Sequence, residues 1–176
     1  MKCRCSDRWS RALWRAMTDA DLPRVLHIAA AVHPSLPEDA AVFAERLALY
    51  PTGCLVHEHG GAVDSYVISH PWQDAAPPAL NTLLGKLPAT PSTYYIHDIA
   101  LMPDARGSGV ANTIVKTLMA HARQNHFATI TLVAVNNSAR FWRKHGFEAV
   151  NDRSLAAKIA SYGADARLMR ATLPPA

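Results

Sequence analysis

A short glycine loop, Arg106-Gly107-Ser108-Gly109, has the residue types needed to hold a phosphate. It follows a strand-like run of aromatic and branched residues, Tyr94 to Leu101, and it opens an amphipathic helical pattern. Glycines allow backbone conformations that are closed to other residues, and the first amides of a helix have no partner within it. These amides, the helix dipole and the charge of Arg106 would all favour an anion. A tight turn that simply requires small residues explains the loop equally well.

The loop lacks the spacing of the two commonest nucleotide motifs, the P-loop and the dinucleotide-binding fingerprint. The segment Ile99–Ala111, IALMPDARGSGVA, instead resembles the Arg/Gln-x-x-Gly-x-Gly/Ala motif of the GNAT superfamily, the Gcn5-related N-acetyltransferases. Val135–Phe147, VNNSARFWRKHGF, is similar to a second family segment, which reads Asn-x-x-Ala, an aromatic pair and then Gly-Phe. Order and spacing both fit, and the resemblance covers roughly Ala12 to Leu173.

The resemblance implies an α/β (α+β) fold: a mixed central sheet of about six or seven strands, helices on both faces, and one parallel pair of strands that splays apart. It also implies that acetyl-CoA is the co-substrate, with its pantetheine arm in that gap, and that no metal takes part. Main-chain groups would hold the arm, the glycine loop and the start of its helix would hold the pyrophosphate, and two later residues would line the thiol. These three sets are Ile99, Ala100, Leu101 and Met102; Arg106, Gly107, Ser108, Gly109, Val110 and Ala111; and Asn136 and Phe141. Phe141 is equally well explained as a core aromatic residue.

The activity implied is transfer of an acetyl group to the amine of a small molecule, by direct attack through a tetrahedral intermediate. The amine must lose a proton, and His97 is the predicted base because an ordinary histidine titrates near neutrality. The same strand of the aralkylamine acetyltransferases, which this one resembles, carries a histidine base. Strand alternation predicts that His97 and Tyr95 share one face and that Asp98, the alternative base, lies on the other. A partly buried histidine bonded to a neighbour is the competing interpretation of His97.

The proton donor for the leaving thiolate is where the chain departs from the family pattern. The family commonly has a tyrosine four residues before the glycine of Gly-Phe, and this chain has Trp142 there. An indole cannot act as an acid, so thiolate would leave unassisted, or water or Tyr95 would protonate it. The alternative hypothesis is a GNAT-like module that senses acetyl-CoA without turnover.

The elements that position these residues follow from periodicity and turn signals. Strands are expected near 13–17, 54–59, 62–69, 94–101, 129–135, 147–150 and 166–173, and helices near 22–32, 38–50, 109–125, 139–145 and 155–162. Gly60-Gly61 predicts a hairpin turn. The Ala/Pro-rich connection at 71–93 is expected to hold a short helix, Ala79–Leu87, and to cover either the acceptor site or a sheet edge.

Composition limits the class of protein. The chain has 176 residues, 49% hydrophobic and 18% charged, which indicates one globular domain over 11–176 after a disordered lead at 1–10. No apolar run or signal-peptide core is present, which predicts a cytoplasmic protein with no membrane partner. The net charge of +4 is scattered, which argues against a nucleic-acid partner.

Three cysteines form no disulfide framework, and Cys3 and Cys5 alone cannot close a metal site. A homodimer would be ordinary for the family.

Overall fold

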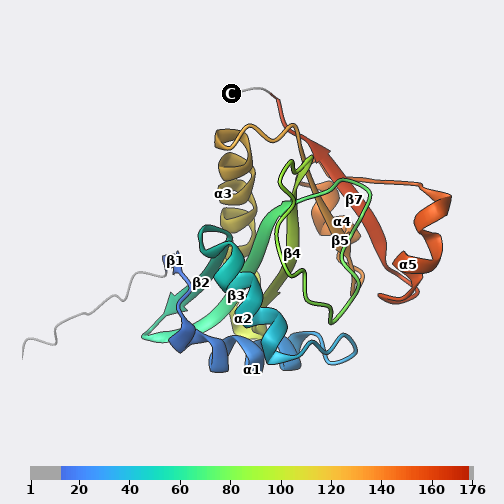
Figure 1. Cartoon of the computed structure of the whole chain (residues 1–176). Coiled ribbons are helices and arrows are strands. Elements are labelled where there is room, and N and C mark those ends of the chain that lie inside the picture. Colours follow the sequence, from blue (N-terminus) through green and yellow to red (C-terminus); the bar gives the residue numbers. More distant parts are fainter. Residues whose placement is uncertain (1–12, 175–176) are drawn as a thin grey trace, which may run out of the picture.

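A computed structural model describes residues 13–174, and within them seven strands form one mixed sheet in the order β1-β2-β3-β4-β5-β7-β6 (Figure 1). The strands are β1 (Leu13–Ala16), β2 (Cys54–His59), β3 (Ala62–Trp72), β4 (Thr93–Leu101), β5 (Thr129–Ala134), β6 (Glu148–Ala149) and β7 (Arg167–Thr172). Among these strands β4 and β5 are the parallel pair, and the other neighbours are antiparallel. The predicted mixed sheet is confirmed. The expected lead at 1–10, with Cys3 and Cys5, lies outside the described residues.

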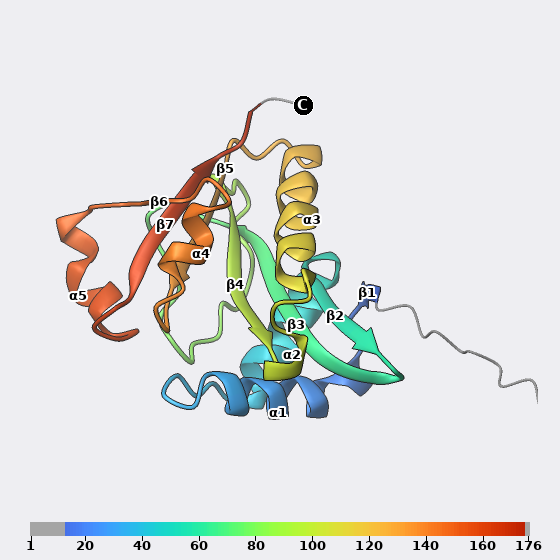
Figure 2. The ribbon, with the colours of Figure 1, turned by 180° about the vertical axis from the view of Figure 1, so that it is seen from behind.

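Helices cover both faces of the sheet, as predicted (Figures 1 and 2). On one face α1 (Leu22–Val32) and α2 (Ala40–Leu49) bury Val25, Ile28 and Phe43 against β2 and β3. On the other, α3 (Val110–Gln124) and α4 (Ala139–Arg143) pack a second core that includes Leu118 and Trp142. The short α5 (Ala156–Ala160) lies beyond β7 (Figure 1). The sheet therefore separates two hydrophobic cores, and the βαβ unit β4-α3-β5 belongs to the second.

The end of α1 places a histidine over the sheet. The Asp21 carboxylate accepts a 2.8 Å hydrogen bond from the Thr18 amide in the short 3-10 turn, Asp19–Asp21, that leads into this helix. At the other end, the amide of His33 still donates to the carbonyl of Ala29, but Pro34 follows and cannot continue the helix. His33 is thus the C-cap residue, directly after the last helical residue, Val32.

A β-bulge in β4 changes the predicted distribution of side chains. Asp98 pairs with Ile68 of β3 and Ile96 pairs with Ser69, so His97 has no partner. Before the bulge, Ile96 packs into the core under α3; after it, Asp98 contacts His33 at the end of α1. His97 bonds to Glu38, just before α2. The prediction that His97 and Asp98 face opposite sides is therefore wrong: the extra residue puts both on the α1–α2 side.

The predicted helix at Ala79–Leu87 is also wrong, because this part of the β3–β4 connection forms turns. Asn81 and Gly85 have positive φ angles of 53° and 70°, which a right-handed helix cannot contain. The amides of Leu84 and Gly85 donate to the carboxylate of Glu45 on α2 instead of to helix carbonyls. The Glu45 side chain thus accepts hydrogen bonds from amides that would donate to main-chain carbonyls in a helix. We call residues 73–92 the strap.

Candidate active site in the gap between β4 and β5

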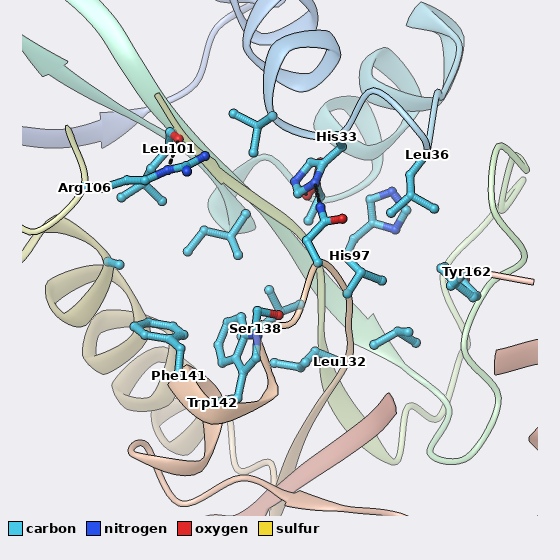
Figure 3. Close-up of a pocket in the computed structure, with 18 of the residues that line it drawn as sticks. His33, Leu36, His97, Leu101, Arg106, Leu132, Ser138, Phe141, Trp142 and Tyr162 are labelled. Carbon is cyan, nitrogen blue, oxygen red and sulfur yellow. Dashed lines mark hydrogen bonds and ion pairs between the residues drawn. The ribbon is translucent and has the colours of Figure 1, made fainter. Parts of the chain in front are cut away.

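The parallel strands β4 and β5 pair over three residues and then separate. Tyr94, Tyr95 and Ile96 align with Ile130, Thr131 and Leu132, and no pairing continues past them. A cavity of about 750 Å³ lies in the gap, with Ile99 and Leu101 on one wall and Leu132 and Val133 on the other. Figure 3 shows Leu101 and Leu132 on opposite sides of this space. Strands that separate leave main-chain donors and acceptors unpaired, so the gap can accept an extended ligand.

The register of β3 and β4 shows which main-chain groups point into the gap. The amide of Met102 donates to the carbonyl of Asp64 at 2.9 Å, so Met102 is bonded to β3. Because antiparallel pairs alternate between bonded and non-bonded residues, Ala100 also turns toward β3, whereas Ile99 and Leu101 turn away from it. Of the four residues predicted to hold a pantetheine arm, Ile99 and Leu101 have the main-chain groups to do so.

One end of the cavity has the geometry of an anion site. Gly107 and Gly109 adopt φ angles of 78° and 89°, a region that favours glycine, and both line the cavity. No side chain caps the start of α3 and its first turn has no acidic residue, so its first amides remain available. Arg106 lies beside them, with its Nε donating to the Leu101 carbonyl at 3.2 Å (Figure 3).

The predicted cofactor residues do not all reach the cavity. Arg106, Gly107, Gly109 and Ala111 line it, but Ser108 and Val110 do not. The hydroxyl of Ser108 turns back to donate to the carbonyl of Ala105 at 2.7 Å. Neither Ser108 nor Val110 therefore contributes to the lining of the cavity.

The far wall of the cavity comes from the turn after β5 and from α4. It holds Asn136, Ser138, Phe141, Trp142 and Lys144. Phe141 is partly buried against the core, and its ring also faces the cavity (Figure 3). Trp142 is 4% exposed and packs on Phe141 and Phe147, with ring centroids 5.1 and 5.2 Å apart. It occupies the tyrosine position of the family motif as a core residue.

The other end of the cavity contains a buried pair formed by Glu38 and His97. His97 Nε2 lies 3.0 Å from Glu38 Oε2, and the two side chains are 8% and 7% exposed. Burial would raise the pKa of Glu38, but the bond and charge of His97 and the amide of Asn81 outweigh it, so that pKa is lowered. Glu38 is then an acceptor only, so the neutral form of the His97 ring has its proton on Nε2 and its lone pair on Nδ1. This arrangement suits a general base.

A second buried pair lies beside the first. Asp98 Oδ1 is 3.1 Å from His33 Nε2, and Asp98 Oδ2 accepts a hydrogen bond from the Tyr66 hydroxyl. Burial would raise the pKa of Asp98, but the charge of His33 and these bonds lower it. His33 Nδ1 lies 2.9 Å from the side-chain amide of Asn136 (Figure 3). Asp98 is thus a paired carboxylate, which makes it a poor free base.

Aromatic rings surround the first pair. Tyr95 is 2% exposed, and burial raises the pKa of its hydroxyl well above the ordinary value, so it stays protonated. The ring of His70 packs against Tyr95 and His97, with centroids 5.7 and 6.2 Å away. His70 Nδ1 donates to the Pro71 carbonyl at 3.0 Å, and its Nε2 has no partner. A neutral histidine therefore lies behind the predicted base.

His70 should make the fold sensitive to acid. Burial lowers its pKa to about 3, whereas in an unfolded chain it is about 6.5. Between these values the unfolded chain binds a proton that the folded chain does not, so stability is complete above pH 6.5 and falls as the pH drops toward 3. We expect that His70→Gln abolishes roughly 3–5 kcal/mol of the decrease in the free energy of unfolding between pH 6.5 and pH 3. Urea unfolding at several pH values measures it, and parallel pH profiles for both proteins would contradict it.

The cavity also contains residues that no sequence pattern identified. Five of them line its acceptor end: His33, Leu36, Glu38, Leu80 and Tyr162. They come from the α1–α2 loop, the strap and the segment after α5, none of which carries a motif. Figure 3 shows Leu36, His97 and Tyr162 on the side away from Arg106. Tyr162 also ties this end to the strap, since its hydroxyl donates to the carbonyl of Pro78.

This chain belongs to the GNAT acetyltransferase family, since the family model described as "Acetyltransferase (GNAT) family" matches residues 11–147. A search of curated proteins found no match. Solved structures with the same fold include the GphF GNAT-like decarboxylase in complex with isobutyryl-CoA, which is 16% identical with a TM-score of 0.76. The alignment covers 92% of this chain and 100% of that one.

Two further solved structures have the same fold. The ribosomal-protein-S18-alanine N-acetyltransferase of Escherichia coli is 16% identical with a TM-score of 0.65, covering 94% of this chain and 96% of that one. Arabidopsis thaliana Naa50, in complex with the bisubstrate analogue CoA-Ac-MVNAL, is 13% identical with a TM-score of 0.68, covering 92% and 98%. At these identities the likeness establishes the fold, and the reaction and acceptor have to be argued from the site.

Within residues 13–174, no helix is long and apolar enough to cross a membrane. The same residues contain no group of three or more histidine, cysteine, aspartate or glutamate side chains arranged to hold a metal ion.

Proposed function

We propose that this protein transfers the acetyl group of acetyl-CoA to the amine of a small molecule. One observation carries the proposal: a single cavity joins an uncapped helix start with two glycines to a buried Glu38–His97 pair. The first feature fits a pyrophosphate, and the second fits removal of a proton from an amine. The main chain of Ile99 and Leu101, which turns away from β3, connects the two ends and fits the amide-bearing arm between them.

The chemistry follows from the residues at the bulge. His97 would take the proton from the attacking amine through Nδ1, directly or through a water molecule. The amide of Ile99 faces the gap and could donate to the carbonyl oxygen as negative charge develops on it. Tyr95 stays protonated and packs beside His97, so it helps to shape the site. Asp98 is occupied by His33 and Tyr66, so we assign the base to His97 and not to Asp98.

Glu38 would act as a positioning residue for His97. Glu38→Gln leaves a side chain of the same size, but its amide can present either nitrogen or oxygen to Nε2, so the tautomer with Nδ1 free is no longer enforced. We expect kcat to fall about tenfold to a hundredfold, with the pH midpoint of the basic group in kcat displaced and the acetyl-CoA dissociation constant unchanged. Glu38→Asp should restore part of the rate. A loss of rate with an unchanged pH profile would indicate a merely structural role.

The strap supports a small acceptor. Asn81 of the strap bonds to Glu38 and Asp39, the carbonyl of Thr82 accepts from Arg46 on α2, and Asp74 forms an ion pair with Arg170 on β7 at 2.6 Å. Leu80 reaches from this strap into the cavity. In Figure 1 the strap runs between α2 and the α5 end of the molecule, over the acceptor side. A covered end with Leu36, Leu80 and Tyr162 suits a compact amine with an apolar part better than a long peptide.

A thiol-release assay with a panel of small amines and short peptides tests this proposal. Acetyl transfer predicts that free CoA appears only when both acetyl-CoA and an amine are present, and that small apolar amines outperform peptides. A sensor module would bind acetyl-CoA but release no thiol. A decarboxylase would convert an acyl-CoA but leave its thioester intact, so it would also release none. Either outcome would overturn acetyl transfer.

A further inference from the structure

The proposed reaction still needs a proton for the leaving thiolate. At the tyrosine position of the family motif, Trp142 is buried in the core and its indole has no acidic proton. Two tyrosines, Tyr95 and Tyr162, line the cavity, but burial makes both hydroxyls weak acids. Burial raises the pKa of Tyr162 to about 12, and its hydroxyl is already directed to the carbonyl of Pro78. Tyr95 is enclosed by protein, and burial raises its pKa well above the ordinary value, so neither hydroxyl is a suitable proton donor for the thiolate.

His33 lies across the β4–β5 gap near the point where the two strands separate. Its ring reaches from Asp98, at the bulge of β4, to Asn136, in the turn that follows β5. Asp98 and Asn136 come shortly after the last paired residues of the two strands, Ile96 and Leu132. A ligand that enters at Gly107–Gly109 and follows Leu101 and Ile99 would bring its far end to this place. Figure 3 shows His33 between Leu101 and His97, facing the cavity.

The surroundings of His33 favour a protonated ring. Burial lowers its pKa, but the Asp98 carboxylate outweighs this, and the net result is a raised pKa. The charged and titratable groups near the His33–Asp98 pair are Tyr66 on β3, His97 on β4, Glu38 before α2 and the more distant Arg106, whose charge lowers the pKa of His33. Nε2 is close to Asp98, although its N–H is not aligned for a good hydrogen bond. The pair is therefore held mainly by charge.

Asn136 is a suitable partner for a ring that gains and loses a proton at Nδ1. Its amide N–H donates when Nδ1 carries a lone pair, and a half-turn of the amide presents its oxygen when Nδ1 carries a proton. The transferable proton is thus the one on Nδ1, while Nε2 stays beside Asp98.

We propose that His33 is the general acid of this enzyme and supplies the proton that the missing tyrosine would have given. This inference rests on the proposed acetyl transfer. As the tetrahedral intermediate collapses, the carbon–sulfur bond breaks, its electron pair goes to sulfur, and the proton on His33 Nδ1 goes to that sulfur. His97 has by then received one proton from the amine. The cycle closes when His97 returns a proton to solvent and His33 takes one up, so protons balance.

His33→Gln tests the assignment, because glutamine keeps polar contact with Asp98 and Asn136 but cannot supply a proton. We expect kcat with the best amine to fall about a hundredfold or more, with little change in the acetyl-CoA dissociation constant. His27→Gln, an exposed histidine of the same helix, should keep full activity. His33→Asn serves as the second variant if glutamine disturbs folding. A kcat within about threefold of wild type would overturn the proposal.

Rescue at position 142 separates an acid from a structural residue. In the His33→Gln background, Trp142→Tyr should restore at least about tenfold of the lost kcat, because it places a hydroxyl where the family has one. Trp142→Phe is the matched control, since it removes the indole without adding a hydroxyl, and it should restore nothing. Equal effects of tyrosine and phenylalanine would contradict the role of His33 as an acid.

A measurement on the free protein gives a readout besides activity. Nitrogen-15 NMR of the histidine rings should show His33 protonated at pH values above the ordinary histidine midpoint of about 6.5, and Asp98→Asn should lower that midpoint. A neutral His33 below that value would overturn the proposal whatever the kinetics. If the wild-type protein acetylated no amine at all, the proposed function itself would fail. If the wild-type protein were active and the His33→Gln variant equally active, only the role of His33 as the acid would fail.

Discussion

Replacing His97 with glutamine is expected to lower kcat by about 10²–10⁴-fold, the usual contribution of a general base. Glutamine can still donate to Glu38, so it avoids leaving a carboxylate buried without a partner, which would cost several kcal/mol. Since His97 lies at the acceptor end of the cavity, and the glycines at the other, acetyl-CoA should bind the variant within about twofold of wild type. Steady-state kinetics and calorimetry measure the two quantities separately.

The split between rate and affinity is what makes this substitution informative. If kcat and acetyl-CoA affinity fell together, His97 would be a structural residue and the base would have to be sought elsewhere. His59→Gln, at the exposed end of β2, is the control for histidine loss as such. It should change neither quantity.

Replacing Gly109 with tryptophan should raise the dissociation constant for acetyl-CoA by about a hundredfold or more. Each factor of ten in this constant corresponds to about 1.4 kcal/mol of binding free energy. A β-carbon at Gly109 meets nothing within 4 Å, so the indole would project into open space at the start of α3 instead of disrupting the core. That space is the proposed pyrophosphate site. The measurement is a calorimetric titration of each protein with acetyl-CoA.

Backbone strain has to be separated from blockage in this experiment. Gly109 has a φ of 89°, which costs a non-glycine residue about 1–2 kcal/mol. Gly60 in the β2–β3 turn has a φ of 63° and equally open surroundings, but it lies away from the cavity. Gly60→Trp should therefore bear a similar strain and bind acetyl-CoA normally. Binding by Gly109→Trp at wild-type affinity would mean that the glycine loop is only a turn.

The parts of the fold that could be predicted are those specified by local sequence. The β4-loop-α3 unit is marked by branched residues, glycines and an amphipathic stripe in immediate succession. The Gly60-Gly61 hairpin joins β2 and β3 as expected, because both glycines adopt positive φ. These patterns depend on backbone conformation within a few residues, and neighbours in space do not change them.

The features that the sequence did not predict depend on contacts between segments that are distant in the chain. The bulge at His97 depends on how β4 pairs with β3, and no residue type in β4 indicates that the strand contains an extra residue. The sequence predicts a helix over Ala79–Leu87 of the strap, but Glu45 of α2 accepts hydrogen bonds from the amides of Leu84 and Gly85. Glu38 was read only as the start of a helix, whereas the structure places it against His97, 59 residues later in the chain. Contacts between distant segments decided each of these features.

The same reasoning explains why the acid could not be found from the sequence. The motif located the position where a tyrosine is common and showed Trp142 there. It contained nothing about His33, which reaches the site from α1 and contacts Asn136 over a separation of 103 residues. The two carboxylate–histidine pairs, Glu38 with His97 and Asp98 with His33, become visible only when the α1–α2 segment is folded over β4.

Transfer of labelled acetyl from acetyl-CoA to an amine tests the central claim most directly. Purified protein would be incubated with carbon-13 acetyl-CoA and the best small amine of the panel, and the products would be analysed by mass spectrometry. Acetyl transfer predicts an amide that carries both labelled carbons, formed with one equivalent of free CoA and lost in the His97→Gln variant. An unmodified amine, with acetyl-CoA intact or consumed at a rate independent of amine, would contradict it.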